Sequence, residues 1–276
     1  MLKKLIRYEF QATARIFLPL YGAFLAMSLL LRLVMTVQEA QNWQGAELPA
    51  WLNLLLAIPV LLYVALFIAT VVMTFVVAVY RFYKNLMTEE GYLMFTLPVK
   101  PIQLMNSKLI AALVWTVLSA LVCLLSLMIL IFTPDLPGAI AYWWQIFVTG
   151  AASEGLYLTT GILVELIVAV LVSCAGFFVQ AYTAVAATNF SDSHKGLMGV
   201  GAYLVINFAS QMIFSILLFI GGMTLYPQIE SMLNNSQDLM WLFHLTIWGS
   251  VAWTAAISAV LYAGTNWILK KKLNLN

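Results

Sequence analysis

Long stretches without a charged side chain constrain this chain more than any other feature of its sequence. Five stretches of 26 to 34 residues contain no Asp, Glu, Lys or Arg, and a sixth covers residues 16–38 with only Arg32 in it. About 20 predominantly apolar residues are enough for a helix to cross the hydrocarbon core of a bilayer. Only 9% of the 276 residues are charged, whereas a soluble domain carries roughly 25%. The sequence therefore predicts a polytopic membrane protein and excludes a soluble enzyme, a disordered chain and a nucleic-acid binder.

The predicted fold class is an all-α polytopic membrane protein with six transmembrane helices, forming a single transmembrane domain over residues 1–276. The fourth span is expected to begin before its charge-free stretch, so that it encloses Glu165. The six spans are expected at about residues 16–38, 51–80, 109–133, 156–188, 197–224 and 241–269.

The Lys and Arg residues predict how these spans are oriented. If the N-terminus lies in the cytoplasm, 12 of the 13 basic residues fall on inner segments, and the remaining one, Arg32, lies within a span. The charged side chains of the outer segments are then all acidic. Because cytoplasmic loops are enriched in Lys and Arg, we expect both termini to be cytoplasmic. The expected location is the plasma membrane, which in a bacterium is the cytoplasmic membrane.

Three segments are expected at the membrane surface rather than across it. Residues 1–15 place apolar and basic side chains at helical spacing, which predicts an amphipathic helix on the cytoplasmic leaflet. The alternative is a basic flank that only sets the topology. Residues 136–153 are free of charge and contain Trp143 and Trp144, so we expect an interfacial or re-entrant segment on the outer side. The end of the fifth stretch, residues 221–229, is expected to bend back or to rise above the outer leaflet.

The longest inner loop covers residues 81–108 and predicts a short helix at the inner face of the membrane. Thr88 is a candidate N-cap, and Glu89 and Glu90 fall in the first turn, where carboxylates favour the positive end of a helix. Pro98 ends the helix, because proline disfavours helical geometry in the residue before it. The apolar side chains of this helix are Tyr92, Leu93, Met94 and Phe95. Such an element can dock on a soluble partner, or it can pack on lipid and on its own spans.

Three elements of this loop carry a family resemblance. In chain order they are Glu89-Glu90-Gly91-Tyr92-Leu93, then Thr96-Leu97-Pro98-Val99, then Lys108 at the entrance to the third span. Together they resemble the coupling-helix region of ABC-2 type transporter permeases. The resemblance covers about 25 residues at the level of the motif. As architecture it extends over the chain, since six spans, an amphipathic N-terminal helix and a short second inner loop are features of that family.

The resemblance implies the transmembrane permease subunit of an ATP-binding cassette transporter. Such a subunit pairs with a second permease subunit, identical or different, and exports an amphipathic compound that is a peptide, lipid-linked or drug-like. ATP and Mg²⁺ are then bound by a separate ATP-binding subunit, so this chain is expected to be no enzyme and to hold no cofactor. Its sequence contains no G-x-x-x-x-G-K-[ST] phosphate-binding motif, which agrees with that division. Membrane lipid is the other expected partner.

The resemblance also implies which residues contact the ATP-binding subunit. The expected coupling residues are Glu89, Glu90, Gly91, Tyr92, Leu93, Phe95, Leu97 and Pro98. The second inner loop is a further candidate contact, through Asp192, His194 and Lys195. The rival interpretation is a self-sufficient membrane protein, either an ion-coupled secondary transporter or a scaffold without transport.

Two charges lie within the predicted spans, Arg32 and Glu165. An ionisable group inside a membrane helix costs roughly 2.5–3.5 kcal/mol on insertion scales and usually has a partner. Their expected depths differ by only about 4–5 Å at 1.5 Å per residue, so we expect an ion pair between the first and fourth spans. This pair is either a structural clamp or part of a cargo or gating path. No metal site is expected, because His194 and His244 have no acidic or thiol group at ligand spacing.

Overall fold

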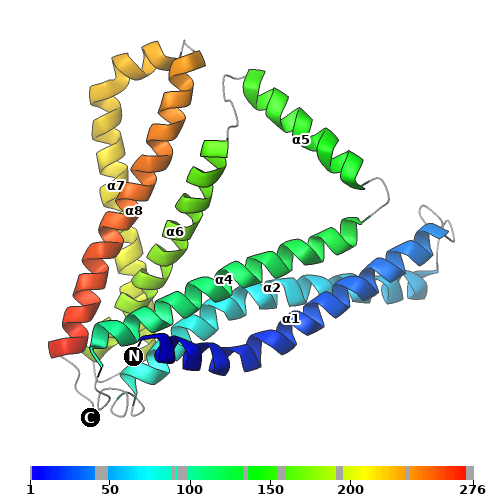
Figure 1. Ribbon diagram of the computed structural model, residues 1–276, viewed down its shortest axis with the longest axis horizontal. Helices are drawn as coiled ribbons and strands as arrows, with labels where there is room; N and C mark the ends of the chain where they lie inside the picture. The colour runs from blue at the N-terminus through cyan, green and yellow to red at the C-terminus, as the bar shows by residue number, and fades with distance from the viewer. Residues whose placement is uncertain are drawn as a thin grey trace. The chain divides into compact units, whose positions relative to one another are not determined.

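The computed structural model describes residues 2–40, 49–88, 91, 99–132, 136–153, 160–190, 195–233 and 236–271, and this part of the chain is helical almost throughout, without strands. Six of its helices are long and apolar enough to cross a membrane, as the sequence predicts. The all-α fold class is therefore confirmed, while the orientation of the termini stays a prediction. The elements are α1 (Leu2–Ala40), α2 (Ala50–Met87), α4 (Pro101–Ile131), α5 (Leu136–Ser153), α6 (Thr160–Ala187), the 3₁₀ turn η1 (Thr188–Phe190), α7 (Lys195–Leu233) and α8 (Ser236–Lys271) (Figure 1).

Several helices are longer than the predicted spans. The expected surface helix 1–15 and the first span form one continuous helix, α1. Helix α2 continues to Met87, because the basic residues at its end do not interrupt the backbone hydrogen bonds. Helix α4 begins at Pro101, a residue suited to the first position of a helix. Whether the first turns of α1 lie on the membrane surface stays a prediction.

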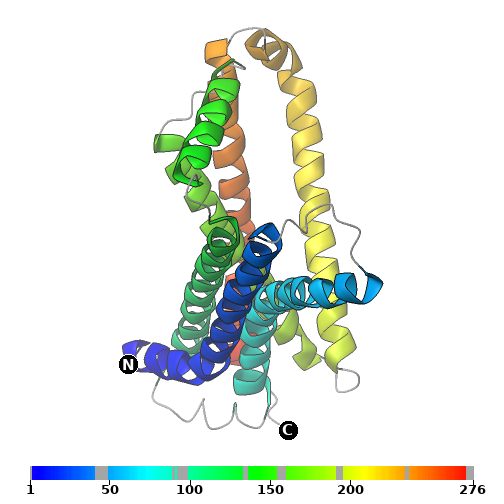
Figure 2. The ribbon, with the colours of Figure 1, turned by 90° about the vertical axis from the view of Figure 1, so that its right-hand side faces the viewer.

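Two of the long helices bend along their length, as Figure 2 shows for α1 and α2. Each contains a proline, Pro19 in α1 and Pro59 in α2. Proline removes a backbone donor and its ring clashes with the preceding turn, and sharp helix kinks are found mainly at such positions. We attribute the two bends to these prolines.

The segment that was expected at the outer surface is a helix, α5, of 18 residues. It is not among the six candidate spans, and most of its side chains are exposed. Helix α7 stays helical to Leu233, beyond the predicted end of the fifth span. Neither result changes the number of candidate spans in the described part of the chain.

Contacts group the helices of the single predicted domain into two compact units. Unit 1 consists of Met1–Tyr80 and Asn106–Leu136, and so contains α1, most of α2 and most of α4. Unit 2 consists of Arg81–Met105 and Pro137–Asn276, and so contains the end of α2, the start of α4 and the helices α5 to α8. Within unit 2, helices α6, α7 and α8 pack against one another.

The core of unit 1 is built from aromatic side chains. Phe17 and Tyr21 of α1 pack with Trp115 of α4, and the ring centroids of Phe17 and Trp115 are 4.6 Å apart. Farther along the same helices, Phe24 stacks on Tyr63 of α2 at 5.4 Å. Both units also expose many large apolar side chains. Exposed apolar surface on this scale is rare in soluble monomers and suits contact with lipid.

Candidate functional site

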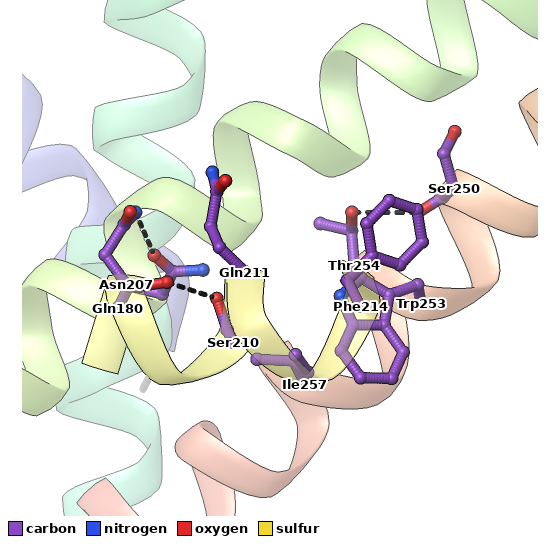
Figure 3. A pocket seen from close by; sticks show the side chains of 9 residues that line it. All are labelled: Gln180, Asn207, Ser210, Gln211, Phe214, Ser250, Trp253, Thr254 and Ile257. Atoms are coloured by element: carbon purple, nitrogen blue, oxygen red, sulfur yellow. Dashed lines mark hydrogen bonds between the residues drawn. The ribbon is translucent and has the colours of Figure 1, made fainter. Parts of the chain in front are cut away.

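A cavity of about 300 Å³ lies among α6, α7 and α8 within unit 2. Ligand sites in proteins start at about this volume. Amides, hydroxyls and two aromatic rings line it, although the three helices are otherwise strongly apolar. The lining residues, drawn in Figure 3, are Gln180 of α6, Asn207, Ser210, Gln211 and Phe214 of α7, and Ser250, Trp253, Thr254 and Ile257 of α8.

The helical repeat explains why these side chains meet. On α7 the four lining residues stand at positions i, i+3, i+4 and i+7 from Asn207, and on α8 the same spacing recurs from Ser250. Residues three and four apart lie on one face of a helix. Each helix therefore presents one mixed polar and aromatic face to the cavity. Sequence reasoning missed this site, although the repeated spacing was a readable signal.

Hydrogen bonds within the cavity wall are few and mostly local. The Asn207 amide nitrogen donates to the Gln180 side-chain oxygen at 3.5 Å, which is long for a hydrogen bond. The Ser210 hydroxyl donates to the backbone oxygen of Asn207 at 3.0 Å, and the Thr254 hydroxyl donates to that of Ser250 at 2.9 Å (Figure 3). The hydroxyls of Ser210 and Thr254 are thus satisfied by their own helices, whereas the amides of Gln180 and Asn207 are joined only by this long contact.

A glycine brings α6 and α8 close together beside the cavity. A Cβ atom at Gly176 would lie 2.8 Å from the Thr254 methyl carbon and 2.9 Å from the Ser258 hydroxyl. Small residues permit such close helix contacts within membranes. Gly176 therefore positions Thr254, one of the residues of the cavity wall.

The cavity lies well inside the candidate spans. Gln180 is seven residues from the end of α6 at Ala187, and Asn207 is twelve from the start of α7 at Lys195. At 1.5 Å per residue these are roughly 10 and 18 Å along the helices. Since the hydrocarbon core is about 30 Å thick, we expect the cavity at an intermediate depth in the membrane.

Glu165, one of the two predicted intramembrane charges, has a partner within unit 2. Its carboxylate on α6 lies 2.7 Å from the ring nitrogen Nδ1 of His244 on α8. Both side chains are partly buried. Sequence reasoning considered His244 only as a metal ligand and did not identify it as a partner of Glu165. Among the residues that the structure describes, no group of three or more His, Cys, Asp or Glu side chains is arranged to hold a metal ion.

Arg32, the other predicted charge, has partners within unit 1. Its guanidinium contacts the backbone oxygen of Leu130 at 3.5 Å and the carboxylate of Glu39 at 3.8 Å. The direct pair between Arg32 and Glu165 stays a prediction. Each charge nevertheless has another polar partner in its own unit, as expected for ionisable groups within membrane helices.

Most of the predicted coupling residues lie outside the part of the chain that the structure describes. These are Glu89, Glu90, Tyr92, Leu93, Phe95, Leu97 and Pro98, together with Asp192 and His194 of the second inner loop. Of the remaining two, Lys195 begins α7, and Gly91 is buried, with its backbone N–H donating to Thr88 at 2.7 Å. A Cβ at Gly91 would lie 2.9 Å from the backbone oxygen of Leu86, so only glycine fits without a backbone shift.

The end of α2 that leads into this loop is anchored on α6. The ring of Phe82 stacks on that of Tyr182, with centroids 4.1 Å apart and planes 7° from parallel. The side-chain amide of Asn189 in η1 contacts the sulfur of Met87 at 3.1 Å. Both contacts are within unit 2. The first contact connects the beginning of the loop to α6, the helix that carries Gln180, and the second connects it to η1, which follows α6.

Unit 1 contains polar side chains of another kind, which we call the polar seam. They are buried between α1, α2 and α4 and contact one another directly. The contacts are Glu9–Lys108 at 2.6 Å, Trp115–Thr13 at 2.7 Å, Tyr21–Ser119 at 2.6 Å, Ser119–Thr74 at 2.6 Å and Ser126–Tyr63 at 3.0 Å. Lys108, known from the loop motif, thus lies opposite Glu9, a residue that sequence reasoning did not single out.

No family model, no curated protein and no solved structure matches this chain. The fold and the candidate spans define the class, a multi-pass membrane protein. The function has to be inferred from the cavity, the charge pair and the loop themselves.

Proposed function

We propose that this chain is the transmembrane subunit of a transporter, with the α6–α8 cavity as its cargo site. The observation that carries the proposal is a cavity lined by amides and hydroxyls among helices that are otherwise apolar. Uncompensated polar groups in a membrane are costly, and they mark substrate pathways when they face an internal cavity. Neither a scaffold nor a simple anchor requires such a lining.

In a more specific form of this proposal, the chain is the permease subunit of an ATP-binding cassette exporter. The resemblance of residues 89–108 to a coupling helix supports this form, and so does the absence of a phosphate-binding motif from the sequence. ATP and Mg²⁺ then belong to a separate ATP-binding subunit, and a second permease subunit completes the pathway. The cargo is an amphipathic compound.

The contact between α2 and α6 supplies a physical route from the loop to the cavity. A partner bound at the loop displaces the end of α2, and Phe82 transmits that displacement to Tyr182 because their rings are stacked nearly parallel, with centroids 4.1 Å apart. Gln180 lies two residues before Tyr182 on α6. A change at the inner loop thus reaches the cavity wall through one helix.

Co-purification with the ATP-binding subunit tests this proposal. We expect a short reading frame with a G-x-x-x-x-G-K-[ST] motif beside the gene, and its product should bind the wild-type chain on co-expression. Glu90→Lys should abolish the binding. Glu230→Lys, the same charge reversal on the side expected to face outward, should leave it intact. Equal binding by both variants would overturn the coupling role of the loop.

The Glu165–His244 pair favours a second candidate, a transporter driven by protons rather than by ATP. An imidazole and a carboxylate in contact at 2.7 Å within membrane helices are the kind of pair from which the proton relays of ion-coupled transporters are built. In that case, a pH gradient alone should drive uptake of cargo into vesicles that contain only this chain. Glu165→Gln should abolish that uptake. Transport that requires ATP and is unaffected by this substitution would exclude the second candidate.

A further inference from the structure

We infer that the α6–α8 cavity selects an uncharged ligand, namely an amphipathic compound whose head group carries amide or hydroxyl functions. The inference deepens the proposed function and rests on it for the ligand's role as cargo. Its chemistry follows from the lining residues themselves and is measurable as binding.

The cavity wall carries no ionisable group, since none of its nine lining residues, all of them in the described part of the chain, has an ionisable side chain. A charged head group in this cavity would lose its hydration without gaining a counter-charge, and such desolvation is far more costly for an ion than for a neutral polar group. The lining therefore discriminates against both anions and cations.

The ionisable pair on the same helices does not supply a counter-charge. Glu165 lies 15 residues from Gln180 on α6, which is roughly 22 Å along the helix. His244 lies six residues from Ser250 on α8, or roughly 9 Å. The two groups also face each other at 2.7 Å, so each already has a partner.

The cavity wall offers both donors and acceptors of hydrogen bonds. A carboxamide offers both donors and acceptors, and the cavity has three, on Gln180, Asn207 and Gln211. The contact between Gln180 and Asn207 is 3.5 Å long, so a ligand that bonds either amide at about 2.9 Å replaces a weak bond by a stronger one. An amide or a pair of neighbouring hydroxyls on the ligand matches this arrangement, because each can both donate and accept.

The cavity wall also has an apolar part, which suits the apolar part of the ligand. Phe214 and Trp253 face the cavity from α7 and α8 with ring centroids 5.5 Å apart, and Ile257 adds an aliphatic surface (Figure 3). These side chains receive a hydrocarbon chain or the face of a ring. At about 300 Å³ the cavity admits a small head group with part of its tail, but not a folded peptide.

The test uses the full chain in lipid nanodiscs and three radiolabelled probes with the same chain length. These are octanoyl-N-methylglucamide, which is neutral, octanoate, which is an anion, and octyltrimethylammonium, which is a cation. Binding is measured at equilibrium and corrected for uptake by empty nanodiscs. We expect saturable binding of the glucamide that is at least about tenfold tighter than that of either ion.

Substitutions at Asn207, compared with a control on the same helix, assign the binding to the cavity. Asn207→Leu should weaken glucamide binding about tenfold, since it removes the amide but keeps the bulk. Thr224→Val should have no effect, because Thr224 is on the same helix, its described hydrogen bonds go to the backbone oxygens of Ile220 and Gly221 in that helix, and it does not line the cavity. Asn207→Asp should make the cation the preferred probe, because it supplies the missing counter-charge.

The outcomes separate this inference from the proposed function. If all three probes bind equally and Asn207→Leu weakens all of them, the selectivity is overturned while the ligand site stands. If no probe shows binding that depends on Asn207, the inference is overturned altogether. Co-purification with the ATP-binding subunit involves neither the probes nor the cavity, so it decides the ATP-driven form of the proposed function independently.

Discussion

The polar seam of unit 1 and the cavity of unit 2 use similar side chains in opposite ways. Hydroxyls and aromatic rings occur in both, together with a carboxylate in the seam and carboxamides in the cavity. In the seam they are no more than 8% exposed and contact one another at 2.6 to 3.0 Å. In the cavity the side chains are at least partly exposed, and the one contact between two side-chain amides is 3.5 Å long.

This difference separates two uses of polar residues within membrane helices. Polar groups that satisfy each other hold helices together. Polar groups that line a space remain available to a ligand. The seam should therefore dominate the stability of the chain, while the cavity should dominate ligand binding with little effect on stability. Each substitution below tests that contrast through the free energy of unfolding in mixed micelles, titrated with a denaturing detergent.

The largest loss of stability is expected from Lys108→Met in the seam. The ammonium group of Lys108 lies 2.6 Å from the Glu9 carboxylate, and both side chains are buried. Removing one half of a buried ion pair typically costs about 3–5 kcal/mol, because the other charge stays in a poorly solvated place. The double variant Glu9→Leu, Lys108→Met should recover most of that loss. A single variant as stable as the wild type would show that the pair does not hold α1 to α4.

Gly176→Ala tests the close packing of α6 on α8 beside the cavity, rather than the polar lining itself. The new methyl group would lie 2.8 Å from Thr254 and 2.9 Å from Ser258, and overpacking of this kind typically costs about 1–3 kcal/mol. Gly249→Ala on α8 is the matched control, because a Cβ there has no neighbour within 4 Å. The control should be neutral or gain up to about 1 kcal/mol through helix propensity. Equal behaviour of the two variants would show that α6 and α8 are not in close contact.

The general fold was predictable from the sequence because charge-free length directly limits what a helix can do. Helix ends were less predictable: α2 continues past its charge-free stretch and α4 begins before its own, since Arg81 and Lys84 of α2 and Lys108 of α4 interrupt the apolar stretch without interrupting the helix. Partners across helices were the least predictable. Glu165 pairs with His244 because α6 and α8 have a particular rotation and depth, and neither is encoded in a local pattern.

The cavity was only partly readable from the sequence. The recurring positions i, i+3, i+4 and i+7 on residues 207–214 and 250–257 indicate one polar and aromatic face on each of two spans. Such a face predicts a lining or a helix contact equally well. Only the distances between Gln180, Asn207 and their neighbours separate these two outcomes.

A moderate effect is expected from Ser119→Ala. Ser119 joins Tyr21 of α1 to Thr74 of α2, with both contacts at 2.6 Å. Hydrogen bonds between membrane helices average about 0.6 kcal/mol and reach about 1.7, so we expect a loss of about 1 kcal/mol. Thr116→Val is the control on the same helix, because the hydroxyl of Thr116 donates to the backbone oxygen of Ala112 in its own helix, and no bond to another described helix is seen. A loss that is no larger than in the control would remove Ser119 from the seam.

The smallest effect on stability is expected from Asn207→Leu in the cavity, within about 0.5 kcal/mol of the wild type. Its only inter-helical bond among the described contacts is the 3.5 Å one to Gln180, and leucine offsets the loss of that weak bond by burying apolar surface. The same variant should lose about tenfold in affinity for the glucamide probe, so stability and binding separate at this one position. A loss of stability above about 1 kcal/mol would show that Asn207 holds α7 to α6 as the seam residues hold α1 to α4. In that case the amides would be a helix contact rather than the lining of a ligand site.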